Sequence, residues 1–118
     1  MLFLIAKGVG TTGTSTITVD ACDNVTPSNH TAVAFMYRAS TTLDVWGAWT
    51  QATATGFTTT AGSNQMYQVY VPASELGTEG YGYARLEAVE VADDPVTGCV
   101  LMAIVNPRHV EVPATMIT

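Results

Sequence analysis

Short stretches in which apolar and polar residues alternate recur along the chain. Between residues 15 and 19, Ile17 and Val19 fall on one side of an extended backbone and the neighbouring threonines on the other, which is typical of a half-buried β-strand. No stretch of ten residues keeps the 3.6-residue apolar period of an amphipathic helix. The pattern therefore predicts strands at 2–6, 15–19, 31–38, 45–49, 64–71, 81–91 and 99–105.

Segments rich in glycine, threonine and proline separate the predicted strands. They predict loops or turns at 20–30, 53–63 and 93–98, and at most one helical turn at 73–76 after Pro72. About seven short strands joined in this way predict an all-β fold, an antiparallel β-sandwich or barrel with extended termini. We expect residues 1–118 to form a single β-sandwich domain, with 110–118 as an extended C-terminal arm.

Some of the predicted strands are apolar on both faces. Residues 2–6 and 99–105 show no polar alternation, nor does much of 32–37. A small sandwich covers one face of each sheet, so three or four apolar side chains would face water, and their burial would contribute on the order of 5–10 kcal/mol. We therefore expect a homo-oligomer with 1–7 as a possible interface strand. A secretory signal is a poor alternative for 2–6, because Lys7 follows the apolar run instead of preceding it.

Composition excludes several classes of protein. The chain has 118 residues, of which 47% are hydrophobic and 12% charged, so an intrinsically disordered chain is excluded. Four basic residues against ten acidic ones give a net charge of −6, too few cations for a nucleic-acid-binding stripe. No apolar run approaches the ~20 residues of a membrane span. We expect neither nucleic acid nor a membrane as a partner.

Catalytic candidates are few and scattered. His30 and His109 could each form a dyad with Cys22 or Cys99, but exposed histidines and buried structural thiols are the better interpretation. Whether the two cysteines form a disulfide stays open. Asp93 and the aspartate after it precede a proline, which favours a solvated turn over a calcium site. The sequence predicts no catalytic residues, no metal and no cofactor.

The two tryptophans offer an alternative function. Trp46 and Trp49, together with Tyr81 and Tyr83, could form an aromatic platform for sugars or anchors in a protein interface. Residues three positions apart on a strand point to opposite faces, which disfavours a flat platform of both tryptophans. We expect one of them in the core and the other at an interface or on the surface.

The order of several segments resembles that of a known class of small proteins. In chain order, a polar Asn-Val-Thr-Pro-Ser-Asn element comes first, and a strand that ends in an acidic-Leu turn follows it. A Tyr-x-Tyr-x-Arg-Leu strand, an apolar strand and a Pro-Arg pair come after that turn. These elements lie at 20–29, 64–76, 81–86, 94–101 and 106–108. Over roughly residues 14–109 the chain is similar to small structural proteins of tailed bacteriophages, most of all to head decoration (cement) proteins.

This resemblance implies a non-enzymatic virion protein. Decoration proteins sit as oligomers, often trimers, on the outer head surface, where they bind the major capsid protein and stabilise the head after assembly in the host cytoplasm. No set of functional residues transfers from the family to this chain. A phage neck or tail subunit and a carbohydrate-binding β-sandwich module remain alternatives, because one fold serves many functions.

Apolar strand faces and extended termini are the predicted means of binding. Strand addition by 1–7 or 110–118 to the sheet of a neighbour would provide main-chain hydrogen bonds. Deleting 1–6 or 110–118 should then weaken assembly and leave the sandwich folded. The predicted interface residues are Leu2, Phe3, Leu4, Ile5, Trp46, Trp49, Val110, Val112 and Met116.

Overall fold

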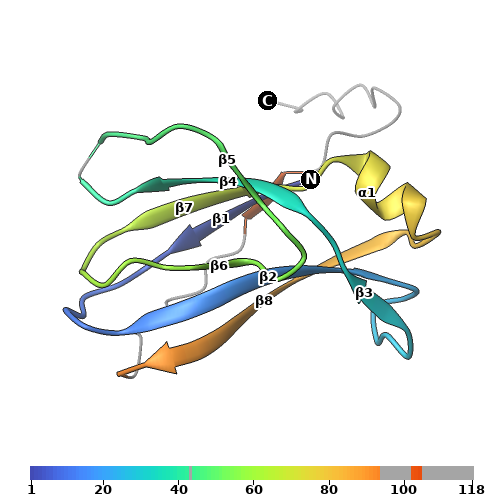
Figure 1. Cartoon of the computed structure of the whole chain (residues 1–118), viewed down its shortest axis with the longest axis horizontal. Helices are drawn as coiled ribbons and strands as arrows, with labels where there is room; N and C mark the ends of the chain where they lie inside the picture. Colours follow the sequence, from blue (N-terminus) through green and yellow to red (C-terminus); the bar gives the residue numbers. More distant parts are fainter. Residues whose placement is uncertain (43, 94–101, 105–118) are drawn as a thin grey trace, which may run out of the picture.

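The computed structural model describes residues 1–42, 44–93 and 102–104, and it is an all-β sandwich (Figure 1). One sheet has five strands in the order β5-β4-β7-β1-β9, and the second has β2 at its centre, paired with β3, β6 and β8; every pairing is antiparallel. The elements are β1 (Leu2–Ala6), β2 (Thr14–Cys22), β3 (His30–Ala32), β4 (Phe35–Ser40), β5 (Thr50–Ala52), β6 (Phe57–Thr58), β7 (Met66–Tyr70), α1 (Ala73–Thr78), β8 (Tyr83–Ala92) and β9 (Met102–Ile104).

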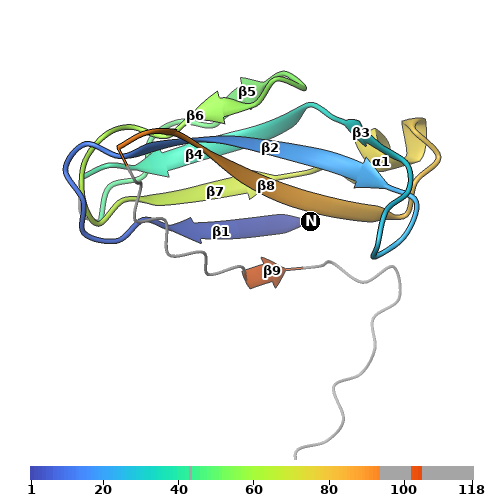
Figure 2. The same ribbon diagram turned by 90° about the horizontal axis from the view of Figure 1, so that it is seen from below.

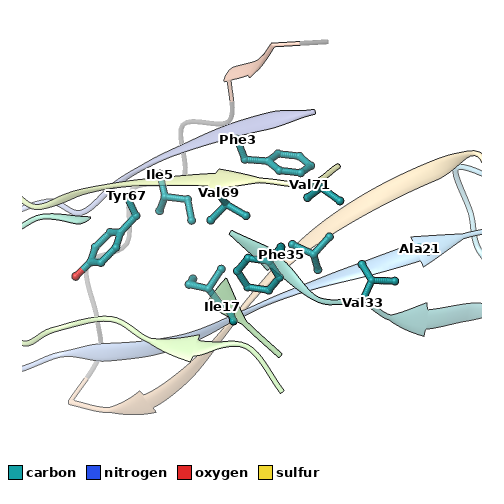
Figure 3. Packing of buried hydrophobic residues seen from close by; sticks show 11 residues of the cluster. Phe3, Ile5, Ile17, Ala21, Val33, Phe35, Tyr67, Val69 and Val71 are labelled. Carbon is teal, nitrogen blue, oxygen red and sulfur yellow. The ribbon is translucent and has the colours of Figure 1, made fainter. Parts of the chain in front are cut away.

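The core lies between the inner faces of the two sheets (Figure 3). Strand alternation supplies it, since every second residue of β1, β2 and β7 is buried. Phe57 of the two-residue β6 closes one side, because its ring stacks on Tyr37 at 3.9 Å and meets Tyr67 at 5.6 Å. The buried apolar residues are Phe3, Ile5, Ile17, Val19, Ala21, Val33, Phe35, Ala52, Tyr67, Val69 and Val71.

The first strand is an interior strand of its sheet. It pairs with β7 along its whole length and with β9 on its other edge (Figure 2), and the amino group of Met1 donates to the carbonyl oxygen of Val71 at 2.8 Å. Its side chains alternate between the two faces of the sheet: Phe3 and Ile5 enter the core, whereas Leu2 and Leu4 are half-buried on the other face. Both edges of residues 2–4 are hydrogen-bonded within the chain, to β7 and to β9, so strand addition to a neighbour through this segment would have to displace β9.

Several other predicted strands are confirmed. Residues 15–19 belong to β2, 64–71 contain β7, and 81–91 overlap β8, in which Ala84 and Leu86 pack against the core. Helix α1 follows Pro72 as expected, but with six residues it is longer than the single turn predicted at 73–76. The apolar segment 99–105 is described only at β9, and the arm at 110–118 and most of the turn at 93–98 lie outside the described residues.

Three predicted segments differ from the structure. The segment 31–38 is divided between the two sheets, because the chain crosses from β3 to β4 at Val33, whose amide donates to the carbonyl oxygen of Val19 at 2.9 Å. The segment 45–49 is not a strand, and the chain returns beside β4 only at β5. The predicted loop 53–63 contains β6, which pairs with β2.

Candidate binding face around Arg38

The five-stranded sheet turns one face away from the core, and its side chains form rows across the strands. One row runs from Leu2 through Tyr70 to Met36, and the next from Leu4 through Gln68 to Arg38, because these residues are opposite one another in the sheet register. We call this surface the outer face. It comprises Leu2, Leu4, Met36, Arg38, Trp46, Trp49, Gln51, Met66, Gln68 and Tyr70.

Arg38 is the centre of this face. Its guanidinium carbon lies 5.0 Å from the ring centroid of Trp46 and 4.8 Å from that of Trp49, which is cation–π geometry for both rings. Its Nε donates a hydrogen bond of 2.7 Å to Oε1 of Gln68. The ring of Trp49 in turn meets Tyr70 edge-on, with centroids 6.5 Å apart. Two indole rings and one amide thus hold the guanidinium in place.

The two tryptophans therefore lie on the same side of the sheet, and neither belongs to the core, so the predictions of opposite faces and of one core tryptophan are both wrong. Those predictions assumed a regular strand at 45–49. The chain instead leaves β4 through the isolated bridge between Thr42 and Val45, and the amide of Gly47 donates to the carbonyl oxygen of Ala39 at 2.8 Å. Alternation does not hold in this irregular segment, so both rings reach Arg38.

Four of the predicted interface residues meet on the outer face: Leu2, Leu4, Trp46 and Trp49. Phe3 and Ile5 are 6% and 0% exposed and fill the chain's own core, so they offer no surface to a partner. Val110, Val112 and Met116 lie outside the described residues.

Sequence reasoning missed six residues of the face: Gln51 of β5, and Met36, Arg38, Met66, Gln68 and Tyr70 of β4 and β7. The signal was present in the alternation of β4 and β7, which sends the residues of these two strands away from the core once Phe35, Tyr67 and Val69 are placed inside.

A second polar cluster lies on the other sheet, around the buried Asp20. Its Oδ2 accepts a hydrogen bond from Nη2 of Arg85 at 2.7 Å and lies 3.2 Å from Nδ1 of His30. Cys22 is the direct cross-strand neighbour of His30. The three strands β2, β3 and β8 thus bring together the residues of a Cys–His–Asp arrangement.

This cluster lacks an activated nucleophile. Burial raises the pKa of the Cys22 thiol, and the nearby Asp20 and Asp23 raise it further, against the opposing effect of Arg85. The thiol is 1% exposed and contacts the carbonyl oxygen of Asp20 at 3.8 Å. A reactive cysteine needs a lowered pKa and access to solvent. Cys22 therefore has the properties of a structural residue, beside a hollow of about 220 Å³ that it lines with Val25, Tyr83 and Arg85.

A polar loop, 23–29, adjoins this cluster and depends on one carboxylate. Oδ2 of Asp23 accepts hydrogen bonds from the Ser28 hydroxyl at 3.1 Å and from both the amide and the side chain of Asn29, at 3.2 and 3.1 Å. Partial burial raises the pKa of Asp23, but these hydrogen bonds outweigh it and hold the pKa below its ordinary value.

The loop should consequently loosen in acid. A carboxyl whose pKa is lower in the folded state stabilises that state above its ordinary pKa of about 4, and this stabilisation is lost as the pH falls through the folded-state pKa. In an NMR titration we expect the backbone amide shift of Asn29 to change with a midpoint below pH 4 in the wild-type protein and to stay flat in Asp23→Asn. A midpoint at or above the ordinary value would contradict the hydrogen-bonded loop.

The described residues hold no cluster of three or more His, Cys, Asp or Glu side chains that could bind a metal ion. Their one helix is too short to cross a membrane.

No protein-family model matches the chain, and comparisons with curated proteins and with solved structures give no match.

Proposed function

We propose that this chain is a non-enzymatic virion structural protein, which decorates and stabilises a phage head by binding major capsid protein subunits on the outer surface. The observation that supports this most is the outer face. Aromatic residues, methionine and arginine are the types enriched at the centres of protein interfaces, and here they share one sheet surface. Trp49, Met66 and Tyr70 are 42%, 37% and 45% exposed, so a partner would remove their apolar area from water.

The proposal also includes the charge of the chain and its mode of assembly. A net charge of −6 suits an outer-surface position better than contact with packaged DNA. We propose a homo-oligomer, with a trimer favoured, as the form that binds the head. Strand addition to a neighbour is proposed for residues 110–118, because β1 is already paired with β7 along its length and with β9 at residues 2–4.

The test is co-sedimentation with empty capsids assembled from the major capsid protein encoded in the same gene cluster. The wild-type protein should sediment with the capsids. Trp49→Ala should raise the dissociation constant about 30-fold, the effect of losing an interface residue worth about 2 kcal/mol.

Val89→Ala is the control, because Val89 is an apolar residue on the other sheet that is 55% exposed, and it should bind as the wild type does. Absence of wild-type binding would refute the decoration role. Equal losses for both variants would refute the assignment of the outer face. A native mass corresponding to a ring of six or twelve would favour a neck or tail subunit instead.

One observation favours carbohydrate binding as the second candidate function. Trp46 and Trp49 lie on the same side of the sheet, next to the donors of Arg38. Quenching of tryptophan fluorescence by a panel of neutral glycans, lost in Trp49→Ala, would support it. Flat titrations together with capsid binding would reject it.

A further inference from the structure

The charge of Arg38 is not matched by a carboxylate within the described residues. The ammonium group of Lys7 is buried and donates to the carbonyl oxygens of Gly13 and Thr60 at 2.6 and 2.7 Å. Arg85 is paired with Asp20. Arg38 donates to a neutral amide and lies against two neutral rings. Among the described lysine and arginine residues, Arg38 is therefore the one whose charged group has neither a carboxylate partner nor buried carbonyl oxygens as acceptors.

The geometry leaves a defined part of the guanidinium for a ligand. Its Nε is occupied by Gln68, and its central carbon lies over both indole rings. The two Nη atoms form no hydrogen bond with any described residue, and neither is buried. Their paired N–H groups match the two oxygens of a carboxylate, the fork-to-fork arrangement that arginine makes and lysine cannot. Because the rings already restrict the side chain, little rotamer entropy remains to be lost on binding.

The surroundings of Arg38 favour a protein carboxylate over an acidic sugar. Met36 and Tyr70 lie in the row next to it, and Leu4 lies beyond Gln68 in its own row, so the cation has apolar side chains around it on three strands. A sugar would need further donors and acceptors for its hydroxyl groups, and Gln68 is already engaged with Arg38. An aspartate or glutamate amid apolar side chains matches such a surface.

We propose that Arg38 receives an Asp or Glu side chain of the capsid subunit, which forms a bidentate ion pair with the two Nη atoms while its apolar neighbours cover Trp49, Tyr70 and Met36. This inference rests on the proposed function and names the chemistry of its partner. The chain as a whole is acidic, so the ion pair adds specificity at one point instead of long-range attraction.

Capsid co-sedimentation of two Arg38 variants tests the inference. Arg38→Gln removes the charge and should raise the dissociation constant at least 30-fold. Arg38→Lys keeps the charge but cannot donate two parallel hydrogen bonds to a carboxylate, so it should bind capsids at least fivefold more weakly than the wild type. Glu79→Gln is the control for a change of one unit of charge, since Glu79 is exposed at the end of α1, and it should bind normally. Melting curves should show that all three variants fold.

The outcomes separate this inference from the proposed function. If the wild type does not bind capsids, both fail. If Trp49→Ala weakens binding but Arg38→Gln does not, only the carboxylate inference fails. If Arg38→Gln lowers the native mass without capsids present, the occupant is a second copy of the chain, and the inference is overturned.

Two further readouts bear on the identity of the acid. Quenching of wild-type tryptophan fluorescence by oligogalacturonate, absent in Arg38→Gln, would assign the site to an acidic saccharide and overturn the inference. Variants of the capsid protein in which single Asp or Glu residues are replaced by the amide should include one that weakens binding to the wild-type chain but not to Arg38→Gln. Additive losses for every such variant would overturn it as well.

Discussion

Ile5→Asp is expected to unfold the protein, whereas Leu4→Asp, one residue away on the same strand, should leave it folded. Ile5 is fully buried between the two sheets. Replacing it by aspartate removes about 2–3 kcal/mol of stabilisation from apolar burial, and the new carboxyl group must also be protonated or lose its water, which costs further free energy. The total of at least about 5 kcal/mol equals the whole stability of many domains. Leu4 lies half-buried on the outer face, where a carboxylate keeps its water, so a cost of about 1 kcal/mol is expected.

Urea unfolding followed by circular dichroism measures this difference. Ile5→Asp should show no cooperative transition, and Leu4→Asp should shift the midpoint by a small amount without changing the slope. The pair is its own control, because both variants remove a branched aliphatic residue and add the same charge to β1. Equal destabilisation by the two substitutions would contradict the alternation of β1 between core and outer face.

Gly56→Ala is expected to be the most damaging small substitution outside the core. Gly56 has a φ of +77°, and a Cβ atom there would lie 2.0 Å from the carbonyl oxygen of Ile17, a backbone atom at the centre of β2. The left-handed backbone costs an alanine about 1–2 kcal/mol, and displacing packed backbone adds about 1–3 kcal/mol. We expect a loss of about 2–5 kcal/mol in the free energy of unfolding.

Gly80→Ala is the matched control for the backbone term. Gly80 has a similar φ of +73°, but a Cβ atom there would meet nothing within 4 Å. Its substitution should therefore cost about 1 kcal/mol, and the difference between the two variants isolates the close approach of the 53–56 turn to β2. If thermal and urea unfolding rank the two variants equally, this close contact is absent.

The predictable part of the fold is the part in which local pattern and burial agree. In 15–19 and 64–71 the apolar residues alternate, and the structure places them in the core. In 2–6 every residue is apolar, so the sequence carried no information on which face would be covered, and the register with β7 decides that Phe3 points inward. The split of 31–38 between the two sheets could not be predicted for a similar reason. The alanines in this segment indicate neither a turn nor a buried face, and the chain crosses at Val33 because its amide binds the carbonyl oxygen of Val19, far away in the sequence.

The site was predictable only in fragments for a related reason. Trp46 and Trp49 stood out by residue type, but their common orientation depends on an irregular connection that no periodicity describes. Arg38 carries no motif. It becomes a candidate only when the register of β4 with β7 places Gln68 beside it and the returning chain brings the indole rings over it.

The interior position of β1 has a consequence for how the chain folds. Ala6 pairs with Met66 and Leu2 with Ile104, so the sheet needs contacts between segments far apart in sequence. During synthesis β1 leaves the ribosome long before β7, and its apolar side chains have no sheet to join until then. Pairings of such high contact order close slowly, in milliseconds to seconds for all-β domains. Until β7 has been made, the apolar side chains of β1 are therefore accessible to chaperones and to neighbouring nascent chains.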